Sequence, residues 1–222
     1  MLILGVDTSG KNGSIALVEF EPGSPRTLEV VPLEGGTFSA QLVPQISDLL
    51  ARHNFNQRNL DGFAVVSGPG SFTGLRVGLA AIKALAEVLE KPIAAVSLLE
   101  ALARSSARQG EITALLDAGR GHVYAGDFRI SENQVITGHQ RSLELAEVAS
   151  TRDREIVTPD LKIAELARHH GLPVDHIPYP RADSIAKFGL EKITAGDTVS
   201  ALDLDANYIR LSDAEIKRAT SE

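Results

Sequence analysis

The stretch Ser67–Lys91, SGPGSFTGLRVGLAAIKALAEVLEK, shapes the first half of the fold because it joins an apolar strand to a long helix through a glycine-rich turn. Neither phosphate-binding fingerprint is complete. Counting from Gly68, Thr73 stands where both G-x-x-x-x-G-K-[ST] and G-x-G-x-x-G require a glycine. The start of the helix remains a generic anion site. A tight strand-to-helix turn with Ser71 or Thr73 as N-cap explains the same residues, and we favour it.

The helix behind this turn is apolar or small around nearly all of its circumference. A surface helix of a soluble monomer shows one apolar face, so a helix with two needs cover on both sides. The sheet covers one side; the other needs a further element of this chain, as in a buried core helix, or a partner. Glycines would let another helix approach closely there. The two stripes are Leu75, Leu79, Ile82, Ala86 and Leu89, and Gly74, Gly78, Ala81, Leu85 and Val88.

Apolar runs and turn residues predict the order β-β-β-α-β-α for the first half of the chain. This is the order of a ribonuclease-H-like or actin-like half-domain, and it differs from the βαβ alternation of a dinucleotide-binding fold. Pro44 falls inside the first helix pattern and should kink that helix or mark its start near residue 41. Strands are expected at residues 2–6, 14–20, 27–33, 63–66 and 93–96, and helices at 39–53 and from the glycine turn to about 90.

The second half repeats this pattern. LGVDTSGKNGSIALVEF and ALLDAGRGHVYAGDFRI each place an aspartate and a glycine-bearing turn between two strands. The repeat predicts a duplicated α/β fold of the actin-like (ribonuclease-H-like) class, with mixed sheets flanked by helices, and lobes at 1–98 and 99–222. Helices are expected at 97–109, 143–149, 161–170 and 182–193, and strands at 112–116, 122–130, 155–158 and, with weak support, 135–136.

Composition excludes several classes of protein. The chain of 222 residues has no cysteine, which removes disulfides, thiolate nucleophiles and cysteine-ligated zinc. The net charge is −7 and no run of Lys or Arg occurs, so we expect any RNA to be held mainly by a partner chain. The apolar run at the N-terminus stops at Asp7 and lacks a basic flank, so no signal peptide or membrane span is expected and a cytoplasmic location follows by default.

Two aspartates, Asp7 and Asp117, end the first strand of each expected lobe. In an actin-like kinase such positions hold magnesium and phosphate, so Asp7, Thr8 and Asp117 support an alternative function as an ATP-dependent phosphotransferase. With Ser9, they are expected to make at most weak anion or nucleotide contacts. The competing interpretation is that each aspartate caps its own turn. No histidine pattern for zinc and no Ser/His/Asp set appears, so neither a metal site nor a catalytic nucleophile is expected.

Four segments together resemble one family: ILGVDTSGKNGSIALVE, VVSGPGSFTGLRVGLAAIKALA, VSLLEALA and LLDAGRGHVYAGDF, with YIRLSDAE (208–215) near the end. The chain is similar to TsaB, also called YeaZ, the bacterial accessory subunit for making threonylcarbamoyladenosine in tRNA. The resemblance implies a two-lobed actin-like fold and a non-catalytic chain. The catalytic paralogue, TsaD, carries a metal-binding histidine pair on the helix matching 39–53, where this chain offers Gln41, Gln45 and His53.

The resemblance also implies partners. TsaB-like chains pair with TsaD, the ATPase TsaE docks on that pair, and homodimers form through related surfaces. No cofactor is expected, unless a nucleotide binds at the subunit boundary. The family's usual histidine before Ser39 is Phe38 here, which should alter local packing only. Proteins of this fold family have also been labelled peptidases, but the sequence shows no nucleophile set or metal pair for that activity. The expected partner surface comprises Leu42, Ile46, Leu49, Leu50, Gly74, Leu75, Gly78, Leu79 and Ile82.

Overall fold

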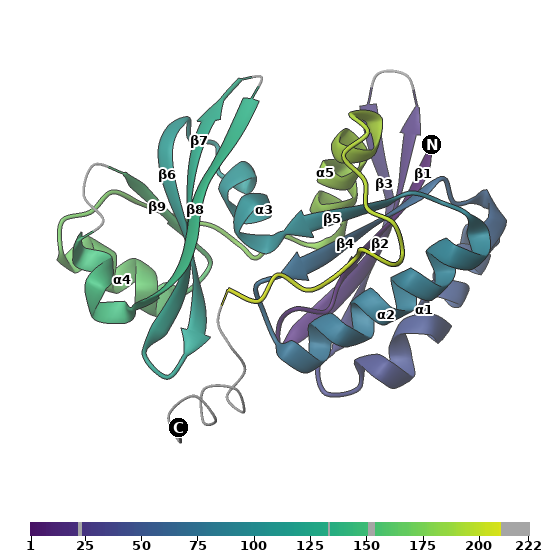
Figure 1. Cartoon of the computed structure of the whole chain (residues 1–222), viewed down its shortest axis with the longest axis horizontal. Helices are drawn as coiled ribbons and strands as arrows, with labels where there is room; N and C mark the ends of the chain where they lie inside the picture. The colour runs from purple at the N-terminus through teal and green to yellow at the C-terminus, as the bar shows by residue number, and fades with distance from the viewer. Residues whose placement is uncertain (22–23, 133, 151–153, 210–222) are drawn as a thin grey trace. The chain divides into compact units, whose positions relative to one another are not determined.

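The computed structural model describes residues 1–21, 24–132, 134–150 and 154–209 (Figure 1). The chain divides into two compact units, each built on one five-stranded sheet. Unit 1 comprises Met1–Leu98 and Pro180–Asn207, and unit 2 comprises Leu99–Tyr179 with the residues from Tyr208 onward.

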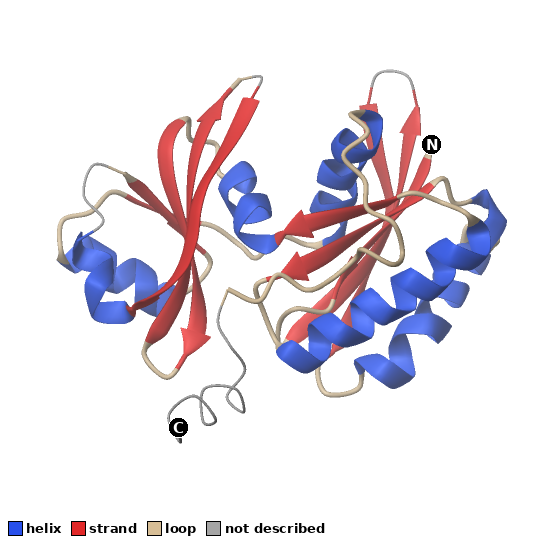
Figure 2. Ribbon diagram, in the orientation of Figure 1, coloured by secondary structure: helices blue, strands red, loops and turns tan. Residues whose placement is uncertain are grey.

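Unit 1 contains a mixed sheet with the strand order β3-β2-β1-β4-β5. The hairpin strands pair antiparallel, whereas β1, β4 and β5 run parallel. Every residue of β1 and β4 is buried, so both faces of the sheet are covered; Figure 2 shows α1 and α2 on one side and α5 on the other. The elements are β1 (Leu2–Asp7), β2 (Asn12–Glu21), β3 (Ser24–Glu34), α1 (Phe38–Arg52), β4 (Gly62–Gly68), α2 (Phe72–Leu89), β5 (Ile93–Ser97) and α5 (Ala182–Thr194), with a short 3-10 turn η1 (Gln57–Asn59).

Helix α5 corrects the expected division of the chain. The predicted boundary after residue 98 coincides with the boundary between the units, but residues 180–207, which the prediction put in the second lobe, belong to unit 1. Small residues explain the tight packing of α5. A Cβ on Gly5 would lie 2.1 Å from the Ala182 carbonyl oxygen, and a Cβ on Gly189 would lie 2.2 Å from the Ala64 Cβ atom. Without a helix on this face, the β1 and β4 side chains that point to it would be exposed to water.

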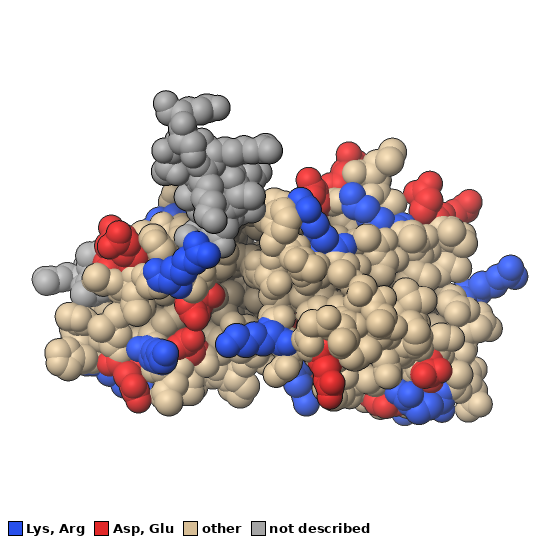
Figure 3. Space-filling view, turned by 90° about the horizontal axis from the view of Figure 1, so that it is seen from below, with Lys and Arg blue, Asp and Glu red and all other residues tan. Residues whose placement is uncertain are grey.

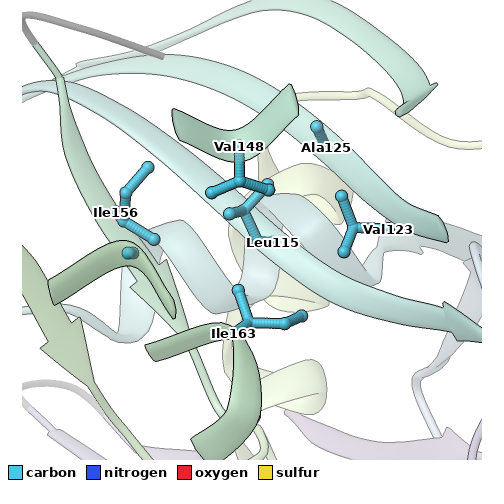
Figure 4. Close-up of a cluster of buried hydrophobic side chains, with 7 residues drawn as sticks. Leu115, Val123, Ala125, Val148, Ile156 and Ile163 are labelled. Atoms are coloured by element: carbon cyan, nitrogen blue, oxygen red, sulfur yellow. The ribbon is translucent and has the colours of Figure 1, made fainter. Parts of the chain in front are cut away.

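Unit 2 has the sheet order β10-β9-β6-β7-β8, with the same pattern of antiparallel and parallel pairs as unit 1. One face holds a core that includes Leu115, Val123, Val148, Ile156 and Ile163 (Figure 4). The elements are α3 (Leu98–Ser105), β6 (Gly110–Gly119), β7 (His122–Ser131), β8 (Gln134–Glu144), η2 (Leu145–Ser150), β9 (Glu155–Thr158), α4 (Leu161–His169) and β10 (Val174–His176).

The two sheets confirm the internal duplication, because strands β6 to β10 repeat the pairing of β1 to β5. The helices differ between the units. The place of α1, between the third and fourth strands, is taken in unit 2 by the six-residue 3-10 helix η2. Unit 2 therefore has the same sheet as unit 1 but fewer helical residues packed on it.

Most predicted elements are present, and several details differ. The helix predicted at 143–149 is instead the end of β8 followed by the 3-10 helix η2, and the short strand β10 was not predicted. Strand β8 is 11 residues long where two were expected. Its sequence lacks a long apolar run, and the strand is defined by its hydrogen bonds to β7. Helix α3 ends at Ser105, earlier than expected. Pro44 lies within α1 without ending it. The family-like segment 208–215 lies outside the described residues from Arg210 onward.

Three glycines in and just before α2 allow the helix to press against the turn that follows β1. A Cβ on Gly70 would lie 2.5 Å from the Ser9 carbonyl oxygen, and a Cβ on Gly74 would lie 2.0 Å from the Thr8 carbonyl oxygen. A Cβ on Gly78 would lie 2.3 Å from Thr8 Oγ1. The close approach inferred from Gly74 and Gly78 is present, but it is made to the chain's own turn and not to a partner helix.

Hydrogen bonds hold the same contact. Thr8 Oγ1 donates to the Gly74 carbonyl oxygen at 2.8 Å, and the Ser71 backbone N–H donates to the Ser9 carbonyl oxygen at 2.7 Å. Ser71 also caps α2, because its side chain accepts from the Gly74 N–H at 3.3 Å. The start of the helix is thus bonded within the chain, as the favoured turn interpretation predicts.

Substitution of the two helical glycines tests this contact. Gly74→Ala and Gly78→Ala should each lower the free energy of unfolding by about 1–3 kcal/mol, since the added methyl group overpacks the turn. Chemical denaturation measures both values. Adding Thr8→Ala should restore part of the loss in Gly78→Ala, where the clash is with a side chain. It should restore none in Gly74→Ala, where the clash is with a backbone carbonyl. Equal rescue of both would show that the helix does not sit on the turn in this way.

Candidate functional site

The turn after β1 holds three of the predicted contact residues, and all three are buried. Asp7, Thr8 and Ser9 expose 6%, 3% and 3% of their surfaces. Asp7 Oδ1 accepts from the Ser9 backbone N–H at 2.8 Å and from Ser9 Oγ at 2.6 Å. Thr8 is engaged with α2. An anion at this turn would compete with these internal bonds, and the expected weak nucleotide contact stays a prediction.

Burial raises the pKa of the Asp7 carboxyl above its ordinary value, because the charged form loses water, and the two hydrogen bonds from Ser9 offset part of this rise. A buried carboxylate of this kind costs stability at neutral pH. Ionisable groups with shifted pKa values are found more often at functional sites, so the Asp7 carboxyl is a candidate for binding a ligand or transferring a proton.

Asp117, the fourth predicted contact residue, lies in unit 2 and is exposed. Its Oδ1 accepts from the Gly119 backbone N–H at 2.8 Å, within the turn between β6 and β7. This bond is the one expected of an aspartate that caps its own turn.

The predicted partner surface is wrong in its residues. Its apolar members in α1 and α2 are all at most 4% exposed, and its two glycines are buried against the turn after β1. They point into the core of unit 1 because the sheet takes the most strongly apolar stripe of each helix. The residues concerned are Leu42, Ile46, Leu49, Leu50, Gly74, Leu75, Gly78, Leu79 and Ile82.

A different arc of the same two helices faces outward. Helices α1 and α2 pack against each other on one face of the sheet, and part of their outward side carries small and apolar residues, beside exposed charged residues such as Arg76 and Glu87. Val43 is 55% exposed and Val88 is 81% exposed. We call this arc the outer face; it comprises Ala40, Val43, Pro44, Ser47 and Ala51 of α1 and Val77, Ala80, Ala81, Ala84 and Val88 of α2.

Ala81 and Val88 belong to the second apolar stripe described from the sequence, so the helical pattern identified two residues of the outer face. It missed Ala80 and Ala84, because alanines at one edge of an apolar helix look like core residues until the core is seen. Phe38, the departure from the usual histidine, is buried beside Gly13, where a Cβ would lie 2.9 Å from its ring.

The far end of α1 is tied to β3 by an ion pair and by a histidine contact to the same carboxylate. Glu29 accepts from Arg52 at 2.9 Å and contacts His53 Nε2 at 2.9 Å. Hydrogen bonds from Arg52 and then His53 lower the pKa of the Glu29 carboxyl. His53, the one histidine of this helix, therefore pairs with a strand carboxylate. The described residues include no group of three or more His, Cys, Asp or Glu placed to hold a metal ion.

The distribution of surface charge does not indicate a particular class of partner. On the face shown in Figure 3, Lys and Arg side chains lie among Asp and Glu side chains, and the described residues there form no continuous basic surface. Within the described part of the chain, no helix has the length and apolar character needed to cross a membrane.

Comparison with known proteins agrees with this fold. The family described as "TsaD: tRNA N6-adenosine threonylcarbamoyltransferase" matches residues 30–211. The tRNA threonylcarbamoyladenosine biosynthesis protein TsaB of Bacillus subtilis (strain 168) is 29% identical over 239 residues, covering 100% of both chains. TsaB of Escherichia coli (strain K12) is 25% identical over 224 residues, covering 95% of each. A solved structure described as YeaZ from Pseudomonas aeruginosa has a TM-score of 0.76 at 24% identity, covering 93% of this chain and 99% of that one.

Two mixed sheets of the same strand order, flanked by helices, define an α/β protein of the duplicated actin-like class. Within that class, the chain belongs to the family of the matching threonylcarbamoyltransferase model, among its TsaB (YeaZ) members. The family resemblance and the fold class inferred from the sequence are both confirmed.

Asp7→Asn tests the cost of the buried carboxylate. The folded-state pKa is raised, so the ionised group destabilises the fold once the pH exceeds the unfolded value of about 3.9. The amide has no charge to lose from water, and its Oδ1 can still accept both Ser9 bonds. We therefore expect Asp7→Asn to have the higher melting temperature at pH 7 and to lose this advantage at acidic pH.

Asp117→Asn is the matched control, because that side chain is exposed and its oxygen can still accept from the Gly119 N–H. Its melting temperature should change little at either pH. A wild type that is more stable than Asp7→Asn at pH 7 would contradict the assignment of a net cost to Asp7.

Proposed function

We propose that this chain is a non-catalytic scaffold subunit in the biosynthesis of threonylcarbamoyladenosine in tRNA. It would act by pairing with a catalytic paralogue of the TsaD type and by enabling an ATPase subunit of the TsaE type to dock on the pair. The named TsaB relatives support the pathway, since they match the chain over its whole length. The observation that carries the pairing step is the outer face of α1 and α2.

The outer face suits a partner because its residues are small or apolar and most of them are exposed. Val43 and Val88 are among the most exposed large apolar residues described, and both lie on helices anchored to the sheet. Alanines between them keep the surface flat, so that a second pair of helices could lie close. Helices of 15 and 18 residues are about 22 and 27 Å long. Side by side they offer a patch suited to a standard interface, which buries roughly 800 Å² per partner.

The non-catalytic role rests on which side chains the structure engages internally. The turn after β1 is bonded to α2 and to itself, and α1 carries Gln41 and Gln45 where the resemblance implies the paralogue's histidines. We propose that the chain works without a cofactor of its own, with any nucleotide at the subunit boundary, and that tRNA is bound mainly by the partner. Alone, the chain would form a homodimer through the same outer face.

Charge placed on the outer face should prevent pairing without unfolding the chain. We expect Val88→Asp and Val43→Asp each to abolish the complex with the catalytic subunit, because burying an unpaired charge costs several kcal/mol. Size-exclusion chromatography of each variant, alone and mixed with the catalytic subunit, measures the loss. The formation of threonylcarbamoyladenosine in the reconstituted system should fall with it.

Leu202→Asp is the matched control, because Leu202 is 90% exposed in unit 1 but belongs to neither helix. This variant should pair normally. Leu79→Asp should instead unfold the protein, since that side chain is in the core. Pairing that survives both Val43→Asp and Val88→Asp would rule out the outer face as the docking surface.

Calorimetry with ATP and magnesium on the chain alone tests the phosphotransferase alternative. We expect no binding that depends on Asp7, whose Oδ1 atom is occupied by Ser9. Tight binding lost in Asp7→Ala would instead favour the kinase function.

A further inference from the structure

Five charged side chains meet on the sheet of unit 2, beyond the end of its apolar core. Glu111 of β6 and Arg129 of β7 are directly paired across the two strands and form an ion pair. Arg141 of β8 contacts Asp127 at 2.6 Å. Arg154 bridges the two carboxylates, at 3.0 Å from Glu111 and 3.9 Å from Asp127. We call these five residues the arginine cluster.

The cluster holds more positive than negative charge. Three guanidinium groups face two carboxylates, which leaves an excess of one positive charge in a chain whose net charge is −7. Each carboxylate contact engages a single nitrogen, namely Nε of Arg129 and Nη1 of Arg141 and of Arg154. A guanidinium has five N–H donors, so among the described residues these ion pairs use a minority of the donors of the three arginines.

The surrounding sheet holds the cluster in place. Thr113, which is fully buried, donates its hydroxyl to Asp127 Oδ1 at 2.9 Å. The side chains of Arg141 and Arg154 are only 29% and 33% exposed, so packing already restricts their rotamers in the absence of a ligand. Ordering long side chains in advance reduces the entropy lost on binding. The ion pair of Arg26 and Glu19 in unit 1 differs, because it joins one arginine to one carboxylate and Arg26 is 68% exposed.

We propose that the arginine cluster is a binding site for a phosphate group. Phosphate fits because it is a compact oxyanion whose oxygens accept paired N–H donors from guanidinium groups. The two carboxylates would hold the arginines apart and correctly oriented, while the excess charge attracts the anion. The group could come from a free polyphosphate or from the backbone of an RNA. This inference concerns residues of unit 2 and does not depend on the outer face of α1 and α2.

Pyrophosphate titrated into the full chain at low ionic strength tests the site by calorimetry. We expect saturable binding whose dissociation constant rises by about tenfold in Arg154→Gln, since a charge-assisted contact is lost. Arg129→Gln should also weaken binding, and it serves if Arg154→Gln folds poorly. Glu111→Gln should tighten binding, because it raises the excess charge.

Arg26→Gln is the matched control, since it removes one exposed arginine from a paired carboxylate outside the cluster. It should leave the dissociation constant unchanged. Equal weakening in Arg26→Gln and Arg154→Gln, weaker binding in Glu111→Gln, or no measurable binding would overturn the proposal.

A second arm of the experiment identifies the source of the phosphate. A short RNA without terminal phosphates is tested for competition with pyrophosphate. Competition that is lost in Arg154→Gln would assign the site to a phosphodiester backbone. Binding of pyrophosphate alone would assign it to a free phosphate. Both results support the phosphate site.

Discussion

The packing of α2 on the turn after β1 is the contact on which unit 1 depends. A helix normally stands clear of a neighbouring backbone by the width of its side chains. Here Gly70, Gly74 and Gly78 remove that width, and the space is filled by the Thr8 and Ser9 backbone and by the Thr8 side chain. The contact fixes the roll of α2 about its own axis. That roll decides which of its two apolar stripes enters the core and which arc is left outside.

The roll of α2 explains why the residues predicted for the interface lie in the core. Leu75, Leu79 and Ile82 are large apolar side chains on one stripe of the helix, and they are buried in the core. The residues left outside include alanines and valines, whose small side chains allow close packing, beside the charged Arg76 and Glu87. The inference that the helix has more apolar circumference than the sheet covers is consistent with Val88, which is 81% exposed.

Duplication followed by loss describes unit 2. Its sheet repeats the pairing of unit 1, but the helix between the third and fourth strands is reduced to η2. A sheet face with less helical cover needs another way to satisfy its residues. Beyond the apolar core around Leu115 and Ile156, charged side chains meet across β6, β7 and β8 and neutralise one another in part. Such a face can stay exposed to water, whereas an apolar one could not.

The sequence alone determined the element order of the first half of the chain, the duplication and the family. Apolar periodicity and turn residues are local signals, and each strand or long helix contains its own. Tertiary structure alone decided where residues 180–207 pack, that the glycines meet Thr8, and which arc of each helix is exposed. These depend on contacts between residues far apart in the chain, such as Gly78 with Thr8 and Gly189 with Ala64. A helical pattern specifies that a face is apolar, but only the packed neighbours determine what covers it.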